Sequence, residues 1–243
     1  MWMKTINVKS VLKIIGLILM ITAAFILFCI PVAIIYSESL APFLLAFATA
    51  MVPGAALYFL IPSQIHEKIT SREGYLSVTL GWITLVLAGS LPFMYSNTIA
   101  GFTNSFFESV SGFTTTGASI LTDIESMPRS ILFWRSLTHW IGGIGIILLV
   151  IIILPTLKVG GYSLFSLESS LKHKILPRTK SVAGVMLLIY LTLTVAEIIL
   201  LTVGGMELFD SICHSFGTVA TGGFSTQNAV SYTHLTLPTK RIV

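Results

Sequence analysis

Long apolar runs separated by short polar segments are the main pattern along this chain of 243 residues. A helix that crosses a bilayer needs about 20 apolar residues, and each run reaches that length. Glycine and proline inside such runs are tolerated because neighbouring helices can satisfy the backbone. The pattern therefore predicts five spans, at residues 11–36, 42–61, 75–95, 131–154 and 182–203.

The composition agrees with this pattern, because 54% of the residues are hydrophobic and 10% are charged. A soluble domain carries about a quarter charged residues. The composition therefore excludes a disordered chain and argues against a water-soluble enzyme. The two cysteines have no metal-ligand spacing and define no disulfide framework. We predict an all-α integral membrane protein in contact with membrane lipid.

The basic residues are sorted by membrane side, so the net charge of +4 does not indicate a nucleic-acid partner. Cytoplasmic loops of membrane proteins carry an excess of Lys and Arg. A cytoplasmic N-terminus places Arg129 and Arg135 outside and ten basic residues inside. The ten are Lys4, Lys9, Lys13, Lys68, Arg72, Lys158, Lys172, Lys174, Arg178 and Lys180. This orientation makes segments 97–129 and 204–228 external.

The two external segments share an unusual plan. Residues 101–112 are apolar in patches but number about 12, too few to cross a bilayer, so they predict a re-entrant half-helix. A Thr/Gly turn follows at 113–119. An offset of 106 residues aligns Gly117 with Gly223 and repeats the same plan in the second segment. Repetition of a span–half-helix–span unit is one way in which a single chain builds a pore.

The chemistry of the two turns suits a monovalent cation. A half-helix that enters from outside directs its partly negative C-terminal end toward the membrane centre. Glycine lets carbonyl groups turn into a pore, and threonine adds hydroxyl oxygens. Neither turn contains an acidic side chain, which argues against a divalent-cation site. The predicted filter residues are Thr115, Thr116, Gly117, Thr221, Gly222 and Gly223.

The turns at 114–119 and 220–225 resemble the degenerate selectivity filters of the Trk/Ktr/HKT superfamily of potassium transporters. Segments 71–75 (Ser-Arg-Glu-Gly-Tyr) and 134–145 (Trp-Arg-Ser-Leu-Thr-His-Trp-Ile-Gly-Gly-Ile-Gly) resemble its Trk branch, the TrkH-type uptake subunits. The two extra N-terminal spans are also typical of that branch. The resemblance covers roughly residues 1–228.

The resemblance implies two N-terminal spans followed by four repeated span–pore-helix–span units, of which about one and a half are present. We expect the chain to divide into four segments, which are two transmembrane helices at 1–70, a first pore unit at 71–157, a second pore unit lacking its final span at 158–228, and a non-native tail at 229–243.

The resemblance further implies potassium uptake across a prokaryotic cytoplasmic membrane, driven by the membrane potential. Potassium is the transported ion and would bind at Thr115, Thr116, Thr221 and Gly222, with no organic cofactor and no enzymatic activity. The implied partners are a second copy of the chain and a cytosolic nucleotide-binding regulatory subunit of the Trk type. Coupling of the cation to H⁺ or Na⁺ stays open as an alternative.

Other roles also stay open at this point. Glu108 and Arg135 have either an electrostatic role at the pore mouth or a structural one. Two remote alternatives to transport are a non-transporting membrane subunit and an intramembrane serine hydrolase. The hydrolase would use Ser111 with His139 or His214, and it requires the serine within hydrogen-bond reach of a histidine.

Overall fold

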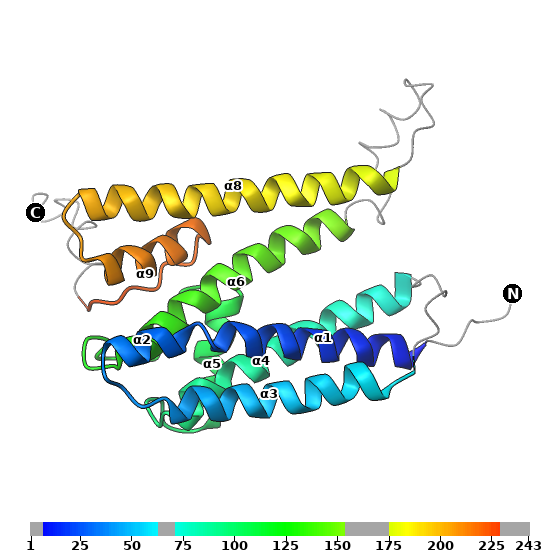
Figure 1. The fold of residues 1–243 in the computed structure, drawn as a ribbon, viewed down its shortest axis with the longest axis horizontal. Coiled ribbons are helices and arrows are strands. Elements are labelled where there is room, and N and C mark those ends of the chain that lie inside the picture. The colour runs from blue at the N-terminus through cyan, green and yellow to red at the C-terminus, as the bar shows by residue number, and fades with distance from the viewer. Residues whose placement is uncertain (1–6, 63–70, 154–174, 229–243) are drawn as a thin grey trace, which may run out of the picture.

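The computed structural model describes residues 7–62, 71–153 and 175–228, and all regular structure within these ranges is helical (Figure 1). This confirms the predicted all-α class. In chain order the helices are α1 (Val8–Ile26), α2 (Cys29–Ile35), α3 (Ala41–Leu60), α4 (Ser71–Tyr95), α5 (Phe102–Phe113), α6 (Arg129–Ile153), α8 (Ile175–Val203) and α9 (Leu208–Val219).

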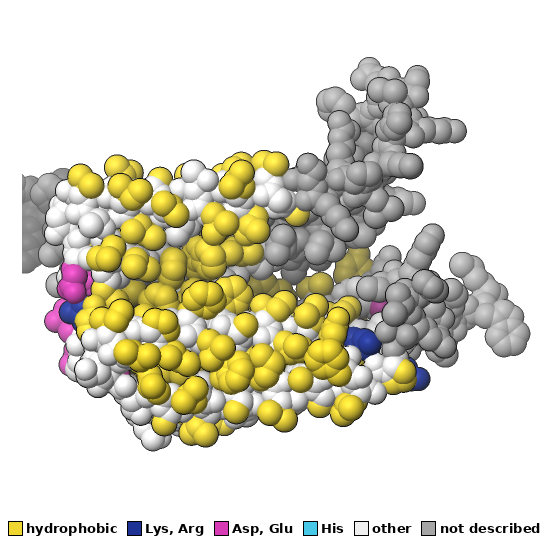
Figure 2. Space-filling view, viewed as in Figure 1, with side chains coloured by type: hydrophobic (Ala, Val, Ile, Leu, Met, Phe, Trp, Pro, Cys, Tyr) yellow, Lys and Arg dark blue, Asp and Glu magenta, His cyan; other side chains and the backbone are white. Residues whose placement is uncertain are grey.

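The long helices coincide with the predicted spans. Four stretches of the described residues are long and apolar enough to cross a membrane, at Val8–Ile35, Ala41–Leu60, Arg72–Tyr95 and Ala183–Val203. The remaining predicted span lies in α6, and its last residue, 154, falls outside the described residues. On the face drawn in Figure 2, hydrophobic side chains spread along the helices and charged ones lie at the two ends. The protein is a multi-pass membrane protein.

The first span is built from two helices instead of one. Helix α1 ends at Ile26 and α2 begins at Cys29, and the two run on in the same direction (Figure 1). Pro31 has no N–H to donate, and its ring clashes with a helical carbonyl four residues earlier, at Leu27. The interruption therefore lies where the proline removes a helical hydrogen bond.

Small residues bring the N-terminal helices together. Helix α1 packs against α3 and α4. A Cβ on Gly16 of α1 would lie 2.8 Å from the carbonyl oxygen of Gly54 in α3, and a Cβ on Gly54 would lie 3.0 Å from that of Gly16. Close backbone approach at small residues is a common basis of helix association in membranes. The two N-terminal spans thus form a tight hairpin beside α4.

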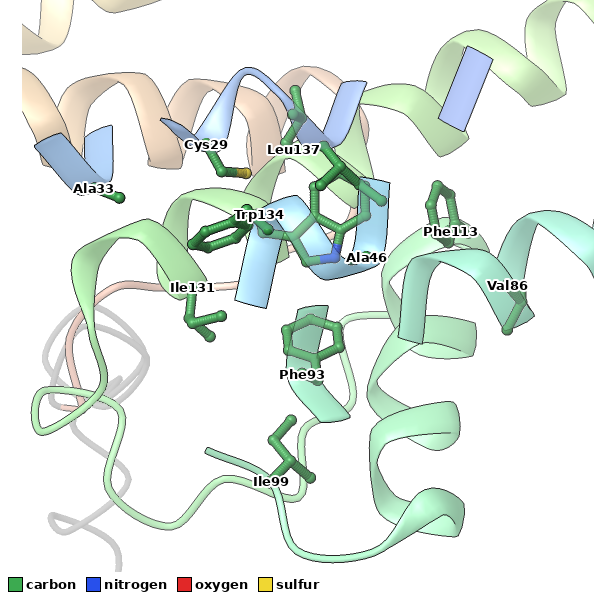
Figure 3. Packing of buried hydrophobic residues seen from close by; sticks show 12 residues of the cluster. Cys29, Ala33, Ala46, Val86, Phe93, Ile99, Phe113, Ile131, Trp134 and Leu137 are labelled. Carbon is green, nitrogen blue, oxygen red and sulfur yellow. The ribbon is translucent and has the colours of Figure 1, made fainter. Parts of the chain in front are cut away.

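A buried aromatic cluster joins this hairpin to the centre of the molecule (Figure 3). Trp134 of α6 is fully buried, and its Nε1 donates to the carbonyl oxygen of Gly89 in α4 at 2.9 Å. The ring of Phe113, the last residue of α5, packs edge-on against Trp134 with centroids 6.4 Å apart. The C-terminal end of the short helix α5 is thereby fixed between two long helices.

Candidate functional site

The two short helices α5 and α9 are structural repeats. Each has 12 residues, and both their first and last residues are related by the offset of 106 that aligns the sequences. The hydrogen bonds that end them also match. The N–H of Thr116 donates to the carbonyl of Ser111 at 3.0 Å, and the N–H of Gly222 donates to that of Gly217 at 2.8 Å. The predicted half-helix repeat is therefore present in three dimensions.

The second residue after each of these helices adopts an unusual backbone conformation. Thr115 has φ 55° and Thr221 has φ 58°, both in the left-handed region. This is the position that ends a helix in a Schellman motif, and it is usually occupied by glycine. A β-branched residue there is an outlier and stores roughly 1–3 kcal/mol of strain. Strain of this kind clusters at functional sites, and here it recurs at equivalent positions of both repeats.

The two turns touch each other at glycine residues. A Cβ placed on Gly117 would lie 2.0 Å from the carbonyl oxygen of Gly222 and 3.8 Å from the amide nitrogen of Gly223. Gly117 and Gly223 also have positive φ, at 77° and 90°. The structure therefore brings the two predicted filter segments into direct backbone contact, with space for no side chain at Gly117.

The six predicted filter residues are at least partly accessible. Thr116, Thr221 and Gly223 are exposed, and Thr115, Gly117 and Gly222 are half-buried. Both helices that precede the turns end there, so their partly negative C-terminal ends face the same place.

Helix α6 lies behind both turns and has glycine where they approach it. A Cβ on Gly142 would lie 2.1 Å from the carbonyl oxygen of Phe113, at the end of α5. A Cβ on Gly143 would lie 3.1 Å from the Cβ of Ala220, which follows α9. The glycine pair thus lets one helix support the start of both turns.

Glu108 and Arg135 form a buried ion pair behind the first turn. Arg135 Nε donates to Glu108 Oε1 at 2.6 Å, and the side chains are 2% and 0% exposed. The same carboxylate accepts from Ser119 Oγ at 2.9 Å and from the N–H of Ile120 at 3.1 Å. Buried charges persist only when they are paired and hydrogen-bonded. This pair fixes the chain that leaves the first turn.

Arg135 also contacts the second turn. Its Nη1 donates to the carbonyl oxygen of Ser225 at 2.9 Å, and its guanidinium carbon lies 3.6 Å from the centroid of the Phe224 ring. A guanidinium over an aromatic ring gains cation–π energy that is larger when the pair is desolvated. One arginine of α6 therefore bridges the two repeats, through Glu108 on one side and Ser225 on the other.

Asn228 forms a second link between the repeats that no sequence pattern indicates. Its side-chain amide donates to Asp123 Oδ1 at 3.0 Å, and its side-chain oxygen accepts from the N–H of Ile124 at 2.8 Å. Its own N–H donates to Glu125 Oε1 at 3.0 Å. Hydrogen bonds from Asn228 and then Ser126 lower the pKa of Asp123. The segment after the second turn is thus tied to the loop after the first.

The residues of the hydrolase alternative do not form a catalytic pair. Among the residues that the structure describes, Ser111 Oγ has no hydrogen-bond partner, and neither does a ring nitrogen of His139. The Nε2 of His214 lies 3.4 Å from Thr226 Oγ1. A serine nucleophile needs a base within hydrogen-bond reach, so this geometry gives the hydrolase alternative no support.

Comparison with known proteins decides the family. The TrkH family, described as cation transport protein, matches residues 39–233, most of the chain. The chain belongs to the TrkH family. Its family resemblance and membrane fold, expected from the sequence, are therefore confirmed. The match ends five residues inside the segment expected to be non-native, residues 229–243, which lies outside the described residues.

Relatives within the TrkH family carry potassium in their names. The "Trk system potassium uptake protein TrkH" of Vibrio parahaemolyticus is 40% identical over 91% of this chain and 46% of that protein. The protein of the same name from Escherichia coli K12 is 40% identical over 91% of this chain and 47% of its own length. The chain spans about half the length of the curated relatives it matches.

A solved TrkH-family structure has the same fold. The crystal structure of the potassium transporter TrkH from Vibrio parahaemolyticus matches with a TM-score of 0.82 and 38% sequence identity. The match covers 93% of this chain and 46% of that one. The arrangement of half-helices and turns thus lies within a fold that a solved member of the family shares.

Proposed function

We propose that this chain forms part of a pore for potassium uptake, in which the two Thr/Gly turns together form part of the selectivity filter. The observation that carries the proposal is the backbone contact between Gly117 and Gly222. It brings the turns of two repeats to one place, as a filter assembled from several pore units requires. The relatives named as potassium uptake proteins support potassium as the ion.

Oxygen atoms of the turns would replace part of the hydration shell of the ion. The proposed potassium ligands are the oxygens of Thr115, Thr116, Thr221 and Gly222. The helix ends that point at the turns add a favourable potential for a cation. A membrane potential of 100 mV supplies about 2.3 kcal/mol per charge, enough to concentrate a monovalent cation tens of times. Coupling to H⁺ or Na⁺ is the alternative within the same class.

Charge placement supports a cytoplasmic N-terminus. Lys9, Lys13 and Arg72 belong to the end of the bundle that carries the start of α1 and α4, whereas Arg129 lies at the other end with Glu38 and Glu207. The excess of Lys and Arg marks the cytoplasmic side. The filter turns would then open to the outside of a prokaryotic cytoplasmic membrane.

The assembly around this segment is also part of the proposal. We infer a four-unit filter completed by further pore units, a homodimer in the membrane, and a cytosolic nucleotide-binding regulatory subunit of the Trk type. The family membership and the names of relatives as parts of a Trk system support these inferences. The division into units at 1–70, 71–157 and 158–228 is carried forward on the same basis.

Uptake of radioactive rubidium tests the proposal. A full-length transporter that carries this segment would be expressed in a strain without other potassium uptake systems. Potassium and rubidium uptake above that of a Gly117→Asp variant, at equal abundance in the membrane, is the expected result. Equal uptake by both proteins would contradict it. Adding a protonophore or removing Na⁺ at fixed membrane potential then separates uniport from symport.

A further inference from the structure

His139 is a buried residue of α6 that the proposed filter does not use directly. It is 0% exposed and lies four residues after Arg135, so both side chains are on one face of α6. Its ring stacks on that of Phe224, with centroids 3.9 Å apart and planes 18° apart. Phe224 immediately follows the glycine pair of the second turn.

The same ring packs against the backbone of Gly222. A Cβ on Gly222 would lie 1.8 Å from Cδ2 and 2.3 Å from Nε2 of His139. The carbonyl oxygen of Gly222 is the atom that meets Gly117 of the first turn. Gly222 is therefore restrained at its Cα by His139 and at its oxygen by Gly117. A shift at either contact moves a proposed potassium ligand.

The polar atoms of the ring are not used for an ordinary structural hydrogen bond. Backbone atoms of Gly112 and Gly222 lie beside the ring, but among the described residues neither Nδ1 nor Nε2 of His139 meets the distance and angle of a hydrogen bond. The ring therefore acts on the second turn through its shape and its stacking.

We propose that His139 is a positioning residue that sets the place of the Gly222 carbonyl and thereby the discrimination between potassium and sodium. The inference rests on the proposed function of the two turns. A flat ring with two torsion angles, stacked on Phe224 and enclosed by the protein, leaves Gly222 little freedom to retreat. Arg135 also contacts Phe224 and Ser225, so two side chains of α6 hold the second turn in place.

Substitutions at His139 separate positioning from packing. In the full-length transporter, His139→Ala removes the ring, whereas His139→Phe keeps a flat ring without nitrogen atoms. We expect His139→Ala to lower the preference for rubidium over sodium about tenfold, which corresponds to about 1.4 kcal/mol. The KM for rubidium should rise by a similar factor, with the maximal rate per molecule falling less than twofold. His139→Phe should restore most of the preference.

Leu137→Ala is the matched control, because Leu137 is a buried residue of the same helix in the hydrophobic core. It should lower abundance in the membrane without changing the rubidium-to-sodium ratio. If His139→Ala does not accumulate, Phe224→Leu tests the same stack and should shift the same ratio.

Three results would overturn the inference. They are an unchanged ion preference in His139→Ala, an equal shift in Leu137→Ala, and a His139→Phe variant as unselective as His139→Ala. Failure of the proposed function is distinct, because the unmodified transporter would then take up no rubidium at all.

Discussion

Gly117 and Gly222 come from different repeats and meet through their backbones. A Cβ on Gly117 would lie 2.0 Å from the carbonyl oxygen of Gly222, closer than any real Cβ contact. The atom in this close contact belongs to the backbone, so it cannot move aside as the end of a flexible side chain can. The contact couples the geometry of the two turns, so a displacement of one turn also displaces the other.

Three glycine substitutions grade this contact. Gly117→Ala meets both a clash and a positive φ, Gly223→Ala meets a positive φ of 90° in open space, and Gly74→Ala in α4 meets neither. We expect rubidium uptake per molecule to fall about tenfold or more in Gly117→Ala, because small misplacements of a preorganised site are costly. Gly223→Ala should have a smaller effect, and Gly74→Ala should match the parent. Equal uptake by Gly117→Ala and Gly74→Ala would count against the contact.

Strain at Thr115 predicts a gain in stability with a loss of transport. Thr115→Gly removes the backbone strain of a left-handed threonine, which is roughly 1–3 kcal/mol. Part of this gain, about 1 kcal/mol, is lost because glycine gives the unfolded chain more conformational freedom. We expect the free energy of unfolding in detergent to rise by about 1 kcal/mol while rubidium uptake falls with the lost hydroxyl. Thr114→Gly is the control, since Thr114 has φ −81° and its hydroxyl donates to the carbonyl of Val110. A loss of stability in both variants would contradict the strain.

The two ion pairs of the described residues should differ in energy because they differ in burial. Breaking the buried pair with Glu108→Gln or Arg135→Met should destabilise by about 3–5 kcal/mol, since one charge is left buried without its partner. Breaking the pair of Arg129 and Glu207, whose side chains are 39% and 55% exposed, should cost less than about 1 kcal/mol.

Unfolding of both single variants and the double variant of each pair measures this difference as a coupling energy. A coupling energy no larger for Glu108 and Arg135 than for Arg129 and Glu207 would show that burial does not govern the bridge.

The pKa of Asp123 predicts a specific acid sensitivity. Hydrogen bonds, that from Asn228 first, lower this pKa below its usual value of about 3.9. A carboxylate with a lowered folded-state pKa adds stability that is present above the unfolded value and lost as the pH falls through the folded one. Asn228→Ala should raise the pKa of Asp123. It should also remove the contribution of Asp123 to the loss of folding stability between pH 6 and pH 3. Thermal melts of parent and variant across that range measure this, and identical pH profiles would contradict the link.

The sequence predicts the spans and the repeat because both depend on local patterns. Apolar length locates the membrane crossings, and one offset of 106 residues places the second half-helix and its turn. Helix α8 begins at Ile175, seven residues before the predicted start of that span, because hydropathy marks the membrane-crossing part of a helix and not its end. The break between α1 and α2 before Pro31 is not predicted, because prolines inside apolar runs are tolerated, as Pro53 in α3 and Pro92 in α4 show.

The contacts that fix the turns depend on tertiary proximity and leave no local signal. Arg135 and Ser225 are 90 residues apart, and Asn228 lies 105 residues from Asp123. Sequence alone leaves the role of Glu108 and Arg135 open between an electrostatic one at the pore mouth and a structural one. The structure places them in a buried bridge between the repeats.

The most direct test of the central claim is a map of anomalous scattering from crystals of a full-length transporter soaked in rubidium. The account predicts a rubidium peak in coordination contact with the oxygens of both turns, including the carbonyl of Gly222. Rubidium peaks elsewhere in the membrane region, with none between the turns of Gly117 and Gly222, would contradict it.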